Sequence, residues 1–133
     1  MDQQKNNMEM TDYPVDWADV YGRIGDEDII AEFAASFLKN SQTLILSLKS
    51  AVNAHSTDQI ELYAHALKGS ASNIGAIVLA KAAWQLEKAG SEKIVRDVDE
   101  QFAVVEQEYA TLKELFESPD WMEHAKRAAE AKI

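Results

Sequence analysis

The chain has 133 residues, of which 47% are apolar and 27% charged, and this composition is expected to give one globular domain with a substantial core. It contains no cysteine, which excludes disulfide scaffolds, thiolate zinc sites and cysteine nucleophiles. The net charge of −10 argues against nucleic acids and anionic membranes as partners, since phosphate contacts need clustered lysines and arginines. No stretch is apolar for the length of a membrane span, and the first residues lack the apolar core of a signal peptide, so we expect a cytoplasmic protein.

The N-terminal part of the sequence predicts a polar tail followed by one short helix. Residues 1–12 show no hydrophobic period and are expected to form a disordered tail. A short helix is expected after Pro14, with Asp16 as its N-cap, because Asp is a favoured cap residue. Gly22 and Gly25 are expected to end this helix.

A long helix is predicted next, from about residue 27 to about residue 54. Asp26 is suited to cap it, and two acidic residues follow in the first turn, where the helix dipole favours negative charge. Apolar residues recur at spacings of three and four, which is the pattern of one helix face. The predicted inner stripe consists of Ile30, Phe33, Ala34, Phe37, Ser41, Leu44, Ile45, Leu48 and Val52.

Two further helices are predicted on either side of Gly75. Thr57 is expected to cap the first of them, and Gly90 is expected to stop the second, because glycine is common just after a helix end. The inner stripe of the first is Ile60, Ala64, Leu67, Ala71 and Ile74. The inner stripe of the second is Ala76, Leu79, Ala83 and Leu86.

The fourth long helix is expected to begin at Ser91 or Asp97. Its apolar residues alternate between spacings of four and three, as bundle packing requires, and they are Val98, Phe102, Val105, Tyr109, Leu112 and Phe116. Ser118 as N-cap and Pro119 at the first helical position predict a fresh helix start. The segment from there to Ile133 is either a last helix that packs back or a frayed tail.

These elements predict an all-α fold: an antiparallel four-helix bundle with a short N-terminal helix and a C-terminal helical extension. No segment alternates with a period of two, and no hairpin signal or internal repeat occurs. The expected organisation is a tail at residues 1–12, a bundle at residues 13–117 and a helical extension at residues 118–133.

The polar face of the predicted helix that begins near Thr57 carries the residues suited to chemistry. On a helical wheel His65 projects away from the core stripe, with Lys68 one turn later and Gly69 directly beneath it. A lone exposed histidine is usually only part of a solvated face. Glycine within a helix, however, costs about 1 kcal/mol relative to alanine, so Gly69 needs a reason. It either leaves room over the imidazole for an approaching group or packs tightly against another helix.

The sequence around His65 resembles the signature of histidine-containing phosphotransfer (HPt) domains. The histidine, lysine and glycine alone would be a weak signal, but the similarity extends from Pro14 to Phe116. Its parts are Ala64-His65, Leu67-Lys68-Gly69-Ser70, Gly75-Ala76, Gly25-Asp26, Leu79 and Leu86-Glu87. The tail at residues 1–12 and the segment after Ser118 lie outside the family core.

The resemblance implies a protein that relays a phosphoryl group between receiver-domain aspartates through a phosphorylated histidine, here His65. The implied partners are the receiver domains of a hybrid sensor kinase and of a response regulator, and the protein is expected to be a monomer. No cofactor and no metal are implied. The sequence also contains no glycine-rich phosphate loop and no Walker-type lysine, so we expect a phosphoryl carrier and not an enzyme with a nucleotide-binding or autokinase site.

Four residues are assigned roles in the expected site. His65 is the nucleophile, since a neutral imidazole has a free ring nitrogen at neutral pH, and we expect the outer nitrogen Nε2 to react. Lys68 is expected to stabilise charge on the phosphoryl oxygens, and Gly69 to give clearance for the receiver. Glu87 on the following helix is either an exposed glutamate or the group that orients the imidazole through its Nδ1–H.

One alternative function and one surface stay open, whereas a metal site is not supported. A helical adaptor that binds receivers or other signalling proteins without carrying phosphate is the alternative function. A metal site from Glu61 and His65 lacks further ligands in register. Ile77 and Trp84 are expected to point away from the core on the flank of Glu87, where either the segment after Pro119 or a receiver domain covers them.

Overall fold

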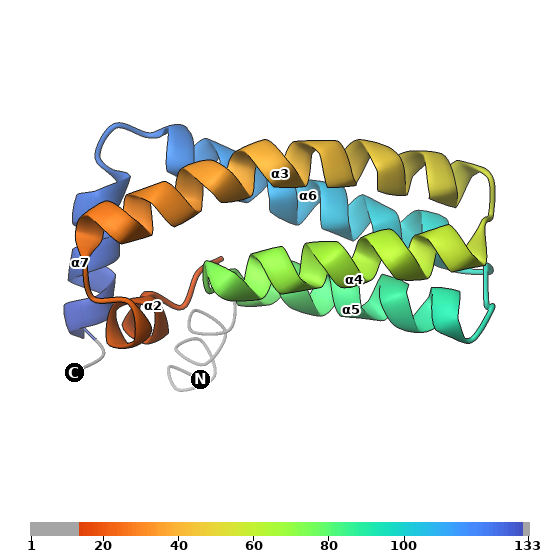
Figure 1. Ribbon diagram of the computed structural model, residues 1–133, viewed down its shortest axis with the longest axis horizontal. Coiled ribbons are helices and arrows are strands. Elements are labelled where there is room, and N and C mark those ends of the chain that lie inside the picture. Colours follow the sequence, from red (N-terminus) through yellow and green to blue (C-terminus); the bar gives the residue numbers. More distant parts are fainter. Residues whose placement is uncertain (1–13, 132–133) are drawn as a thin grey trace, which may run out of the picture.

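The computed structural model describes residues 14–131, and within this range the chain contains only helices and no strand. The four long helices lie side by side along the long axis, and successive helices run in opposite directions (Figure 1). The predicted antiparallel four-helix bundle is therefore confirmed, while the tail expected at residues 1–12 lies outside the described range. In chain order the helices are α2 (Trp17–Arg23), α3 (Glu27–Asn53), α4 (Thr57–Asn73), α5 (Ile77–Ser91), α6 (Val98–Glu117) and α7 (Trp121–Ala131).

The core of the bundle is made by the predicted apolar stripes. In α4, α5 and α6 the stripe residues are buried, apart from the half-buried Tyr109, whose hydroxyl donates to the carbonyl oxygen of Leu38 at 3.2 Å. The prediction that Phe33 belongs to the inner stripe of α3 is wrong, because this residue is 41% exposed. Phe33 lies at the edge of the stripe, where it borders a shallow groove with Ser70 and Asn73 of α4.

Several helices begin or end at other residues than the glycines and capping residues in the sequence predicted. Gly22 lies inside α2, which continues to Arg23. Thr57 is the first residue of α4, and the N-cap position is taken by Ser56 without a side-chain hydrogen bond. By contrast, Asp16 and Asp26 cap their helices as predicted, each accepting hydrogen bonds from backbone N–H groups of the first turn.

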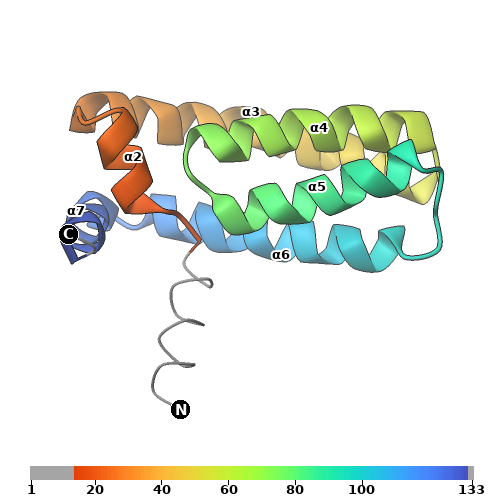
Figure 2. The same ribbon diagram turned by 90° about the horizontal axis from the view of Figure 1, so that it is seen from below.

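The turn before α7 also differs from its prediction. Ser118 is the C-cap of α6 and not an N-cap, and its hydroxyl lies 2.6 Å from the Asp120 carboxylate. Pro119 belongs to the turn, and α7 begins only at Trp121. The two extra turn residues redirect the chain so that α7 crosses the end of the bundle (Figure 2).

Gly90 does not stop α5, contrary to the prediction. It lies inside the helix, and a Cβ atom there would come within 2.7 Å of the backbone at Thr57 O and Glu61 N. Lys93 takes the left-handed conformation that ends the helix, with φ at 58°. Gly90 is therefore required for the close approach of α5 to α4.

An aromatic cluster closes the end of the bundle where α2 and α7 lie. Trp17 of α2 stacks on Trp121 of α7 with ring centroids 5.7 Å apart. Phe116 meets Trp17 and Trp121 edge-on, at 6.1 Å and 5.1 Å. The segment after Pro119 is thus a helix that packs back on α2, which settles the choice between helix and frayed tail.

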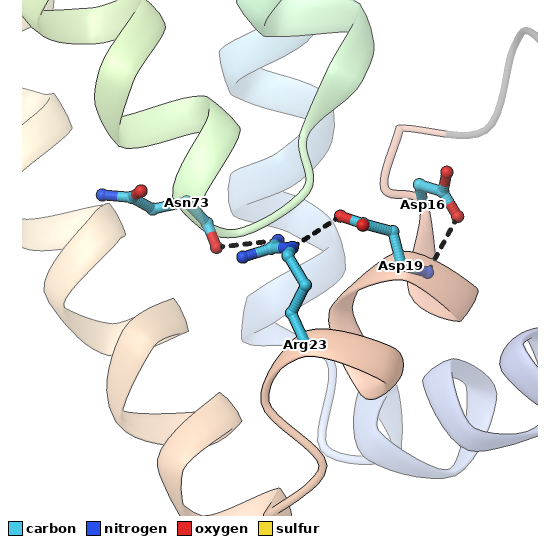
Figure 3. Close-up of polar contacts among 4 residues, drawn as sticks. All are labelled: Asp16, Asp19, Arg23 and Asn73. Carbon is cyan, nitrogen blue, oxygen red and sulfur yellow. Dashed lines mark hydrogen bonds and ion pairs between the residues drawn. The ribbon is translucent and has the colours of Figure 1, made fainter.

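Polar contacts tie α2 to the turn between α4 and α5 (Figure 3). The backbone N–H of Asp16 donates to the carbonyl oxygen of Gly75 at 2.8 Å. Arg23 donates from Nη2 to the carbonyl oxygen of Asn73 at 3.3 Å, and its Nε pairs with Asp19 at 2.8 Å. The contact of Arg23 satisfies the carbonyl group of the last residue of α4, which has no partner within the helix.

None of the helices between residues 14 and 131 combines the length and apolar character needed to cross a lipid bilayer.

We predict that Gly90→Ala destabilises the protein by about 1–3 kcal/mol, because the added methyl group would force α5 away from the backbone of α4. Urea unfolding followed by circular dichroism measures this change. Gly22→Ala is the matched control, because a Cβ atom at this helical glycine meets nothing within 4 Å and should stabilise α2 by up to about 1 kcal/mol. A Gly90→Ala protein as stable as the wild type would contradict the packing argument.

Candidate functional site

His65 lies in the middle of α4 on the face that points away from the core. Its neighbours Ala64 and Leu67 are fully buried, whereas 67% of the His65 side chain is exposed. The helical period of the apolar stripe fixes this orientation, as the wheel predicted. An imidazole in this position is held by a rigid helix and is open to an approaching molecule.

One carboxylate contacts two of the predicted site residues on α4. Glu87 of α5 places Oε2 at 2.7 Å from Nδ1 of His65 and Oε1 at 2.6 Å from Nζ of Lys68. The Glu87 side chain is only 18% exposed, so the pair of contacts is partly shielded from solvent. The structure thus brings together three of the four predicted site residues, with Glu87 in contact with the imidazole and not free in solvent.

The charge of Glu87 decides which nitrogen of His65 is free. Burial favours the neutral carboxyl, but the hydrogen bonds from Lys68 and His65 outweigh it, and the net pKa of Glu87 lies below the ordinary value. The ionised carboxylate is only an acceptor, so Nδ1 must carry the proton in the contact with Oε2. Nε2 then keeps its lone pair and is the nitrogen available to react.

The close approach of α5 to α4 determines where Glu87 lies. Gly90 follows Glu87 by one helical turn and lies on the backbone of α4 near Thr57 and Glu61. Glu61 in turn precedes His65 by one turn. Sequence reasoning missed this positioning role of Gly90, because a glycine near a helix end is first interpreted as a stop signal.

Gly69 faces open space beside His65. A Cβ atom at Gly69 would meet nothing within 4 Å, so no neighbouring helix requires the glycine here. Of the two readings left open by the sequence, tight helix packing therefore finds no support in the structure. The flanking Ser70 is half-buried and Ser72 is exposed.

The site offers no metal-binding cluster. Between residues 14 and 131 no group of three or more histidine, aspartate or glutamate side chains lies close enough to hold an ion. The contact between Glu87 and the imidazole also occupies Nδ1 of His65.

An apolar surface borders the site on α5. Ile77 is 43% exposed and Trp84 is 45% exposed, and Nζ of Lys88 lies 5.5 Å from the centre of a Trp84 ring. Because α7 packs at the end of the bundle against α2, the segment after Pro119 does not bury this surface. Of the two covers considered for Ile77 and Trp84, the C-terminal extension as far as Ala131 does not bury them.

Comparison with known proteins identifies the family of this chain. A family model of the Hpt domain matches residues 32–115, a range that contains His65, Lys68, Gly69 and Glu87. The chain belongs to the Hpt domain family. Hpt domains are histidine phosphotransfer modules of phosphorelays, and Hpt proteins are phosphocarriers and not enzymes.

A solved structure has the same fold as this Hpt protein. Histidine-containing phosphotransfer protein B from Pseudomonas aeruginosa PAO1 is 24% identical in sequence, with a TM-score of 0.71. The match covers 87% of this chain and 97% of that protein. Among curated proteins no sequence matches significantly.

The lowered pKa of Glu87 predicts how its contacts respond to pH. A carboxylate whose pKa is lower in the folded state stabilises the fold above the ordinary glutamate range, and this contribution disappears as the pH falls through the lowered pKa. We therefore expect Glu87→Gln to lose about 1 kcal/mol of stability at pH 7 and to match the wild type in acid.

Urea unfolding of both proteins at several pH values measures this difference. Glu92 is an exposed glutamate at the C-terminal end of α5, so Glu92→Gln removes the same charge and should change stability at neither pH. A loss for Glu87→Gln that persists unchanged in acid would show that charge is not its source.

Proposed function

We propose that this Hpt protein carries a phosphoryl group on Nε2 of His65 between the aspartates of receiver domains. The observation that carries the proposal is the bridge from Glu87 to both Nδ1 of His65 and Nζ of Lys68. This bridge leaves Nε2 as the free nitrogen of an exposed ring. Nothing in an inert adaptor would require that arrangement.

The proposed transfer needs one nucleophile and one leaving group. The Nε2 lone pair attacks the phosphorus of an aspartyl phosphate, a P–N bond forms, and the P–O bond breaks with its electron pair left on the aspartate carboxylate. Donation to a second receiver reverses these steps with that receiver's aspartate as nucleophile. Phosphoryl transfer depends mostly on positioning and charge stabilisation, and a receiver would supply its own Mg²⁺ and lysine.

The other site residues support this reaction in different ways. Lys68 contributes positive charge one turn from His65, where a charge pair at about 4 Å is worth roughly 1–4 kcal/mol, depending on the dielectric. Gly69 provides clearance for the receiver, in accord with the open space around it. Glu87 orients the ring and selects the tautomer.

We further propose that the protein has no autokinase or nucleotide-binding site of its own. The receiver domains would belong to hybrid sensor kinases and to response regulators. A monomer, no nucleic acid partner and a cytoplasmic location are the corresponding expectations from the sequence. The exposed surface at Ile77 and Trp84 lies on the helix that supplies Glu87 and is available to a docked receiver.

We predict that His65→Gln abolishes phosphoryl acceptance and leaves the free energy of unfolding within about 0.5 kcal/mol of the wild type, because the side chain is exposed. The test incubates the protein with radiolabelled, phosphorylated receiver domains and follows transfer of label. His124→Gln is the matched control, since the His124 side chain is also 67% exposed but lies on α7. Label on the His65→Gln protein would refute the carrier assignment, whereas receiver binding without label in the wild type would favour the adaptor.

We predict that Gly69→Ala raises stability by up to about 1 kcal/mol, because alanine is the better helix former and the added methyl meets no atom. Gly69→Leu should also fold but should slow transfer from a receiver, because the larger side chain stands beside His65. Thermal melts and transfer rates on the same proteins measure both effects. Gly22→Leu in α2 is the control for an added side chain remote from His65, and unchanged transfer in Gly69→Leu would contradict the clearance argument.

A further inference from the structure

The contact between Glu87 and His65 has a second consequence once the ring carries phosphate. We propose that the negative charge of Glu87, beyond its hydrogen bond, keeps phosphorylated His65 protonated at Nδ1 and so keeps the phosphoryl group transferable at neutral and mildly alkaline pH. This inference rests on the proposed function and adds to it a specific task for the carboxylate charge.

The chemistry of the leaving group gives the reason. When Nε2 of the Nδ1-protonated ring accepts phosphorus, the product is a phosphorylated imidazolium with one proton on Nδ1. If that proton stays, breaking the P–N bond returns the electron pair to Nε2 and releases neutral imidazole. If the proton is lost, the same step must release an imidazolate anion, which is a far poorer leaving group. The proton on Nδ1 therefore controls how readily His65 gives up its phosphoryl group.

The geometry favours retention of that proton. Oε2 of Glu87 lies 2.7 Å from Nδ1, the distance of a strong charge-assisted hydrogen bond, and the carboxylate is 18% exposed. Lys68 fixes the other oxygen at 2.6 Å, so the carboxylate cannot turn away without losing an ion pair. The partial burial also strengthens the attraction between Oε2 and a cationic ring relative to water.

The charged groups around the ring come from α4 and α5. Lys68 and His65 are the groups that lower the pKa of Glu87, and both lie on α4. Glu61 lies one turn before His65 on α4, and Lys88 of α5 is turned over the Trp84 ring. Between residues 14 and 131 no ion pair joins a charged group of α3 or α6 to His65, Lys68 or Glu87.

Glu87→Gln separates the charge from the hydrogen bond. The glutamine carbonyl can accept from a protonated Nδ1, and its amide can donate to a bare Nδ1, so a contact is retained in both states of the ring. Only the charge that stabilises the imidazolium is lost. Glu92→Gln removes an equal charge from an exposed position on the same chain and is the matched control.

The experiment loads each protein with phosphoramidate, removes the reagent and follows release of inorganic phosphate between pH 6 and pH 9. In this hydrolysis a water oxygen attacks phosphorus, the P–N bond breaks, the electron pair returns to Nε2 and a water proton passes to solvent. For Glu87→Gln we expect the fall in rate with rising pH to shift to a lower pH by about one unit, which makes release roughly tenfold slower at the alkaline end. Glu92→Gln should follow the wild type, and superimposable profiles for wild type and Glu87→Gln would overturn the inference.

A second measurement does not depend on loading the variant. Nitrogen NMR of the phosphorylated wild type reports the pH at which Nδ1 loses its proton, with the same phosphoprotein unfolded in urea as the reference. The inference requires the proton to be lost at a higher pH in the folded protein, and an equal or lower pH would overturn it. If no variant and no wild type protein became phosphorylated on His65, the proposed function itself would fail, which is a different result from phosphorylation with unaltered pH profiles.

Discussion

The geometry of the candidate site depends on how closely α5 approaches α4, and that distance is set at Gly90. With no Cβ atom, Gly90 lies directly on the backbone of α4, where any other residue would come within 2.7 Å of Thr57 O and Glu61 N. Glu87, one turn earlier on α5, is thereby brought within hydrogen-bond distance of side chains on α4. A wider separation of the helices would leave a partly buried carboxylate without its two partners. The loss of stability from an unpaired charge of this kind is larger than the stability that an exposed ion pair provides.

Contacts at one end of the bundle hold α4 and α5 in register. Gly75 adopts a positive φ of 73° at the turn between α4 and α5, and Val20 of α2 packs where a Cβ atom of Gly75 would lie. Arg23 and Asp16 bind carbonyl groups of the same turn. The α2 helix therefore acts on the end of α4 that follows His65, while the aromatic cluster with α7 holds α2 in place.

Hydrophobic period was enough to predict the bundle and the outward direction of His65, because both follow from the helical repeat within one segment. Contacts between segments could not be predicted in that way. Glu87 and His65 are 22 residues apart, so their contact depends on the register of two helices. Gly90 and Ser118 carried familiar local signals for helix ends, and in both cases packing of the whole fold decided their position instead. The resemblance to a family supplied Glu87 as a candidate before any geometry could.

The distribution of charge explains why so simple a site can serve a carrier. The helix bundle holds the imidazole rigidly, and between residues 14 and 131 no three histidine, aspartate or glutamate side chains are grouped so that they could hold a metal ion. Under the proposed function a receiver would supply its own Mg²⁺ and lysine, and the role of the Hpt protein would be to keep its histidine able both to accept and to donate the phosphoryl group. One partly buried carboxylate can meet both requirements: it keeps Nε2 nucleophilic when the ring is free, and its charge favours the imidazolium when the ring is phosphorylated. Lys68 holds that carboxylate ionised, so the lysine supports the histidine through Glu87 as well as through its own charge.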